Sequence, residues 1–77
     1  MMPFISREEL QSLREKYKPG TRVELLHMDD VQAPPPGTRG TVRGVDDAGD
    51  LLITWDTGST LKLIIGVDDF RVVDDYD

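Results

Sequence analysis

The side chain best suited to acid–base chemistry in this sequence is its single histidine, His27, because imidazole titrates near neutral pH. Nucleophilic catalysis would require a serine or threonine hydroxyl and an orienting carboxylate beside it. The chain contains these residue types, but no spacing in the sequence places them together. We therefore interpret His27 as a surface or strand-end residue and predict no catalytic residues.

Aspartate pairs recur along the chain, and carboxylate oxygens are the ligands that Ca²⁺ and Mg²⁺ prefer. The densest group consists of Asp46, Asp47 and Asp50. Its spacing differs from that of the acidic loop of an EF-hand. Aspartate is also frequent in turns, because its side chain accepts hydrogen bonds from nearby backbone groups. The sequence therefore predicts turns at these pairs, with no metal site and no cofactor.

Size and composition limit the chemistry further. The chain has 77 residues, enough for one domain with a thin core and no deep substrate cavity. It contains no cysteine, which excludes disulfides and thiolate metal sites. No segment approaches the roughly 20 apolar residues of a membrane span, and the first residues lack the features of a signal peptide. We expect a cytoplasmic protein that is not an enzyme and has no membrane partner.

Charge is distributed unevenly along the chain, whose net charge is −6. Residues 1–22 contain five bases and three acids, whereas residues 23–77 contain four bases and twelve acids. The acidic part is interpreted as a solvated surface that aids solubility or, alternatively, as a face that meets a basic partner. Acidic charge repels phosphates, so nucleic acid would have to bind through the basic N-terminal part.

A helix is predicted near residues 7–17. Ser6 and Glu9 have the spacing of a capping box, and Pro19 with Gly20 ends the helical pattern. Apolar residues recur between them at helical intervals, at Leu10, Leu13 and Tyr17. We assign residues 1–18 to this segment, which either packs on the rest of the domain or presents its apolar stripe to a partner.

After Gly20 the apolar period changes to two, which is typical of strands. Five short strands are predicted, near 21–28, 38–45, 51–55, 61–63 and 70–73. Turn signals separate them at intervals of about 8–12 residues, a spacing that favours a small antiparallel barrel. The predicted fold class is therefore mainly β, with one short N-terminal helix, a five-stranded antiparallel barrel over 19–73 and an acidic tail at 74–77.

Several turn and strand segments form a recognisable set: Pro19–Leu25, Met28–Asp30, Pro35–Val42, Val45–Gly49, Trp55–Ser59 and Gly66–Asp68. Together they resemble a family of small bacterial and phage domains catalogued as domain of unknown function 4314. The resemblance runs from about Tyr17 to Val73. It implies that the barrel is SH3-like and that the chain occurs in bacteria, phages or mobile elements. It implies no activity and no site residues.

Two looser likenesses concern the same fold. The segment Trp55–Ser59 followed by Gly66 is similar to the Mib/Herc2 domain, an SH3-like protein-binding module. A set of glycines and aliphatic residues is similar to the KOW motif of ribosomal and transcription proteins, namely Gly20, Val23, Leu25, Gly37, Gly40 and Val42. The chain departs from the KOW pattern by its longer, acidic, proline-rich loop, which argues against RNA contact.

Trp55 is expected in the core, because it shares a strand face with Leu51 and Ile53. The alternative is a partly exposed indole at a groove beside the 29–37 loop, where SH3-like barrels often bind. On that hypothesis the opposite wall consists of Met28, Asp29, Asp30, Val31, Pro34 and Pro35. A second candidate contact surface is the helix, with Arg7, Leu10, Leu13, Arg14 and Tyr17.

We predict a small interaction module that binds a protein through the groove or the acidic face. One alternative is an anti-defence or regulatory protein of a phage or mobile element, whose acidic surface occupies a DNA-binding site. A second alternative is KOW-like binding of nucleic acid through the basic helix.

Overall fold

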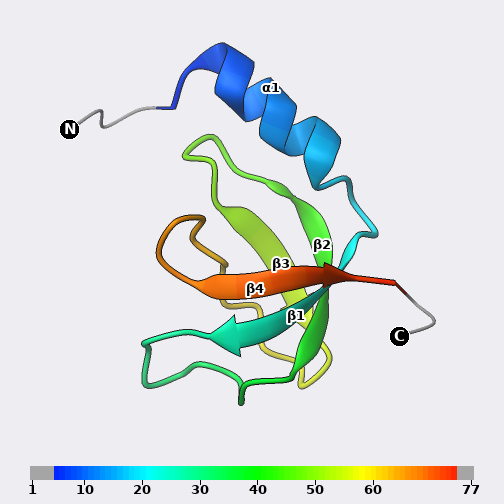
Figure 1. Ribbon diagram of the computed structural model, residues 1–77, viewed down its shortest axis with the longest axis vertical. Helices are drawn as coiled ribbons and strands as arrows, with labels where there is room; N and C mark the ends of the chain where they lie inside the picture. Colours follow the sequence, from blue (N-terminus) through cyan, green and yellow to red (C-terminus); the bar gives the residue numbers. More distant parts are fainter. Residues whose placement is uncertain (1–4, 75–77) are drawn as a thin grey trace.

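The computed structural model describes residues 5–74 of the chain and is mainly β (Figure 1). It contains one helix and four strands: α1 (Arg7–Lys16), β1 (Arg22–His27), β2 (Arg39–Val45), β3 (Leu51–Trp55) and β4 (Asp69–Val73). The helix and four of the five predicted strands are thus confirmed, with ends that differ by at most one residue. The predicted tail at 74–77 lies outside the described residues except for Asp74, as do residues 1–4 of the helical segment.

The four strands form one antiparallel sheet in the order β3-β2-β1-β4. β1 and β2 are the two central strands. In β1, Arg22 lies opposite Thr41 of β2 and Val73 of β4. The register shifts between Val42 and Gly44 and again between Leu25 and His27, where β-bulges increase the local twist. No pairing joins β3 to β4 in the part of the chain that the structure describes, so the sheet is not closed and a barrel is not confirmed.

The prediction of a fifth strand at 61–63 is wrong. Leu63 forms a single isolated bridge with Leu51, closed by two backbone hydrogen bonds of 2.9 and 3.0 Å. The chain then turns back at once, because the Ile64 carbonyl accepts hydrogen bonds from the amides of Val67 and Asp68. Alternating Leu61 and Leu63 satisfied the strand pattern, but the turn that follows leaves room for only one paired residue.

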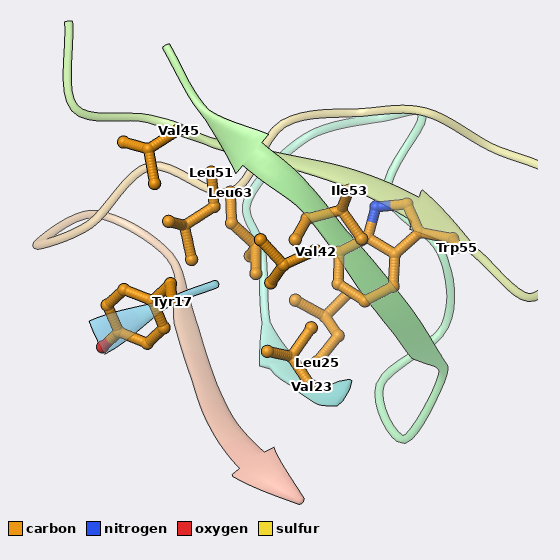
Figure 2. Close-up of a cluster of buried hydrophobic side chains, with 9 residues drawn as sticks. All are labelled: Tyr17, Val23, Leu25, Val42, Val45, Leu51, Ile53, Trp55 and Leu63. Atoms are coloured by element: carbon orange, nitrogen blue, oxygen red, sulfur yellow. The ribbon is translucent and has the colours of Figure 1, made fainter. Parts of the chain in front are cut away.

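The hydrophobic core lies on one face of the sheet. Its buried members alternate along the strands, as the period of two requires. They are Val23, Leu25, Val42, Val45, Leu51, Ile53 and Trp55, joined by Tyr17 and Leu63 from outside the strands. Figure 2 shows the cluster, with Trp55 at one end and Tyr17 at the other. The core packing expected for Trp55 is therefore confirmed.

Helix α1 packs on the domain above the β2–β3 turn (Figure 1). Its N-cap is Ser6, whose hydroxyl accepts the Glu9 amide at 3.1 Å as the capping pattern predicted. Leu10 and Leu13 pack against the core, and the Arg14 guanidinium donates to the Val45 carbonyl at 3.0 Å. The first of the two predicted alternatives, a helix that packs on the rest of the domain, is thus the one observed.

Gly40 marks the tightest approach between β2 and β3. A methyl group added at its Cα would lie 2.7 Å from Ile53 Cγ2 and 2.8 Å from Trp55 Cε3. A methyl group added at Gly44, which is also in β2, would have no atom within 4 Å of it. The close backbone approach that glycine allows thus occurs at Gly40.

We predict that Gly40→Ala lowers the free energy of unfolding by about 1–3 kcal/mol, because the added methyl overpacks the core against Trp55. Gly44→Ala is the matched control and should leave stability unchanged or slightly increased, since its space is open. Urea denaturation followed by Trp55 fluorescence measures both. Equal midpoints for the two variants would contradict the assignment.

Candidate partner-binding groove

A surface groove lies at the end of the sheet where β1 ends and β4 begins. Its volume is about 410 Å³. One wall comes from the loop after β1 and the other from the segment before β4. The lining residues are Met28, Asp29 and Asp30 on the first wall, and Thr60, Leu61, Lys62, Ile64, Val67 and Asp68 on the second. We call this feature the groove.

The groove differs from the predicted one in its second wall. Trp55 does not line it, because its side chain is only 1% exposed and lies within the core. The indole Nε1–H donates to the Leu61 carbonyl at 2.8 Å, so Trp55 supports the second wall from behind. On the first wall Pro34 is buried, whereas Val31 and Pro35 are exposed and do not line the groove. Of the seven residues predicted for the groove, three line it and four do not: Met28, Asp29 and Asp30 are in the lining, and Val31, Pro34, Pro35 and Trp55 are not.

Hydrogen bonds within the loop hold the first wall in place. The Asp30 carboxylate accepts the Gln32 amide at 2.8 Å, and the Asp30 carbonyl accepts the Ala33 amide at 3.0 Å. At the far end of the loop the Gly37 amide donates to the Leu25 carbonyl at 2.7 Å. Proline residues 34–36 restrict the backbone between these points. The loop that carries Asp29 and Asp30 is therefore fixed at both ends.

The second wall is held by a tight turn at 64–68. Asp68 Oδ2 accepts the Ile64 amide at 2.8 Å, and the Asp68 amide donates back to the Ile64 carbonyl at 2.9 Å. Gly66 has a φ of +87°, a conformation that side-chain-bearing residues rarely adopt. This reciprocal pair of hydrogen bonds places Ile64 and Val67 at the protein surface.

Lys62 on the second wall is joined to the β2–β3 turn. Its ammonium lies 2.8 Å from Asp46 Oδ2, and this hydrogen bond lowers the pKa of the Asp46 carboxyl below its ordinary 3.8 and raises the pKa of Lys62 above 10.5. Asp46 Oδ1 accepts the amides of Ala48 and Asp50 at 3.0 and 2.9 Å, which is the turn role predicted for this residue. The positive charge of Lys62 is thus balanced by a carboxylate outside the groove.

The groove combines apolar and acidic side chains. Its apolar lining consists of Met28, Leu61, Ile64 and Val67, and its carboxylates belong to Asp29, Asp30 and Asp68. Within residues 5–74, no three histidine, aspartate or glutamate side chains come close enough together to hold a metal ion. His27 is exposed and lies opposite Asp69 in the β1–β4 register.

The predicted helix contacts divide between three environments. Tyr17 is buried, with its ring centroid 5.8 Å from that of Phe70. Leu13 lies at the floor of a second hollow of about 600 Å³ between α1, residues 48–50 and Ile65. Arg7, Leu10 and Arg14 line a third, smaller hollow beside the helix. These five residues therefore do not form one continuous surface.

The outer face of the sheet carries ion pairs. The Glu24 carboxylate lies between two guanidinium groups, 3.3 Å from Arg71 Nη2 and 3.2 Å from Arg39 Nε. These two hydrogen bonds, that from Arg71 foremost, lower the pKa of Glu24. Arg22 contacts both carboxylate oxygens of Asp56 at 2.8 and 2.7 Å and lowers its pKa. Acidic residues on this face are thus balanced by neighbouring arginines.

A family model described as Domain of unknown function (DUF4314) matches residues 6–73. The chain belongs to this family. The match confirms the resemblance seen in the turn segments, and in this DUF4314 chain it spans the helix, all four strands and both walls of the groove. No curated protein matches the chain closely enough to count as a relative. Across residues 5–74 the one helix, α1, has ten residues, too few to cross a bilayer.

Acid should destabilise this DUF4314 chain. Asp46, Glu24 and Asp56 have lowered pKa values when folded, so the folded state binds their protons less readily than the unfolded state. Their contribution to the free energy of unfolding is complete at a pH above their ordinary pKa values of 3.8 and 4.5. It is lost as the pH falls through the lower pKa values of the folded state. Lys62 acts in the opposite direction, with a contribution lost above pH 10.5.

Melting temperature measured from pH 7 to pH 2 tests this, with Asp46→Asn as the informative variant. The amide keeps the acceptor for the turn but loses the charge opposite Lys62. We expect a lower melting temperature than wild type at pH 7 and a smaller loss on acidification. An acid-induced loss as large as that of the wild type would contradict the role given to the Asp46–Lys62 pair.

Proposed function

We propose that this chain is a non-catalytic module that binds a segment of a protein partner in the groove. The observation that supports the proposal is a preformed apolar groove whose two walls are each fixed by their own hydrogen bonds. Because both walls are ordered before a partner arrives, binding would cost little conformational entropy in this chain. The SH3-like architecture stays part of the proposal, as a bent sheet with a binding groove beside its longest loop.

Exposed apolar side chains support the same surface. Ile64 and Val67 are 42% and 69% exposed, although the turn that carries them is tightly hydrogen-bonded. Ile65 between them is 38% exposed and lines the hollow beneath α1. Contiguous exposed apolar residues on a small protein are typical of interaction sites. Their position along the groove favours a partner segment that inserts an apolar side chain.

The ion pairs make the two alternatives less favourable. Glu24, Asp46 and Asp56 each pair with a base, so these three carboxylates add little unbalanced charge to an acidic surface that would occupy a DNA-binding site. Nucleic-acid binding through the helix segment would need its cations, yet Arg14 is engaged with Asp47, as Arg22 of the neighbouring β1 is with Asp56. Binding of a protein segment in the groove does not require any of these ion pairs to break.

Selection of peptides from a random display library on the full chain tests the proposal. The selected peptides should shift the backbone amide NMR signals of Leu61, Ile64 and Val67. Val67→Asp should weaken the binding of these peptides at least tenfold, because it replaces an apolar side chain of the groove lining with an unpaired charge.

Val31→Asp is the matched control, since it makes the same chemical change at a fully exposed position outside the groove lining. Its affinity for the selected peptides should stay within twofold of wild type. Thermal melting of both variants verifies that they fold, and surface substitutions of this kind usually change stability by less than about 0.5 kcal/mol. Peptides that bind Val67→Asp as tightly as wild type would refute the groove as the binding site.

A further inference from the structure

We propose that the groove selects a partner segment in which a bulky apolar side chain is flanked by lysine or arginine. This inference rests on the proposed function and adds the chemistry of the partner to it. The apolar requirement follows from the apolar part of the lining, which consists of Met28, Leu61, Ile64 and Val67. A groove of about 410 Å³ lies within the roughly 300–1,000 Å³ range typical of ligand sites and accommodates a large side chain.

The requirement for a cation in the partner follows from the charged residues of the groove lining. Asp29, Asp30 and Asp68 place three carboxylates along the groove, against one base, Lys62. The ammonium of Lys62 is itself held 2.8 Å from Asp46, outside the groove. The local charge that a partner meets is therefore negative, and cations in the partner segment complement it.

Two of these carboxylates are fixed in orientation before a partner binds. Asp30 accepts the Gln32 amide through Oδ1, and Asp68 accepts the Ile64 amide through Oδ2. Each therefore uses one oxygen to hold its own wall and has a second oxygen for a donor from the partner. Preorganised carboxylates suit charge-assisted hydrogen bonds from lysine or arginine.

The same charges argue against an anionic occupant. Phosphate groups or an acidic peptide would meet three carboxylates at close range, which costs binding energy instead of providing it. The net charge of −6 acts in the same direction over longer distances and favours encounter with cationic segments.

The peptides selected on the full chain provide the first measurement. Their sequences should be enriched in a bulky apolar residue with lysine or arginine within a few positions of it. Binding of the strongest peptide should weaken about three- to tenfold in the double variant Asp29→Asn, Asp30→Asn, as expected for the loss of two exposed charge pairs. Affinity of the wild-type chain should also fall as salt is raised from 50 to 300 mM.

The control for total charge is Glu8→Gln, Glu9→Gln, which removes the same two charges from the exposed start of α1. Its affinity should match that of wild type. Equal weakening in the two double variants would show a general charge effect and overturn the inference.

The outcomes separate this inference from the proposed function. Peptides that lose binding in Val67→Asp but show no basic enrichment would overturn the cationic requirement and leave the groove as the binding site. Peptides that bind Val67→Asp as well as wild type would overturn the proposed function, and this inference with it. A library that yields no binding peptide would overturn both.

Discussion

The contact between Trp55 and Gly40 is the constraint on which the rest of this structure depends. The indole ring lies so close to Gly40 that no Cβ fits between them, and its N–H reaches the Leu61 carbonyl. One side chain thus brings β3 against β2 and fixes the start of the groove's second wall. The groove therefore depends on the core, because Leu61, which lines the groove, is held by the hydrogen bond from the buried Trp55.

Electrostatics divides the molecule into two regions. On the outer face of the sheet, arginines and carboxylates alternate across neighbouring strands, as in the row formed by Arg71, Glu24 and Arg39. Cross-strand pairs of this kind stabilise a sheet and set its register. Along the groove the carboxylates instead bond to backbone amides through one oxygen, as Asp30 and Asp68 do. The first pattern serves the fold, whereas the second leaves charge at the surface where a partner can meet it.

Much of this architecture could be predicted from the sequence, because local signals and tertiary packing agree. The cap at Ser6 and the alternation through Leu51–Trp55 both appear where the residue pattern indicated. The prediction of a fifth strand failed because the tight turn after Leu63, held by hydrogen bonds within residues 64–68, overrides the alternation. The second wall was missed for the same reason, although the apolar run Ile64-Ile65-Gly66-Val67 ahead of two aspartates was a signal that could have located it. Burial of Pro34 depends on the assembled fold, which periodicity does not describe.

The β2–β3 turn contacts two distant parts of the chain through adjacent residues. Asp47 pairs with Arg14 of α1, and Asp46 pairs with Lys62 on the second wall of the groove. Two adjacent aspartates thus give the β2–β3 turn contacts with both the helix and the groove wall. A change in the length of this turn would therefore disturb both ion pairs at once.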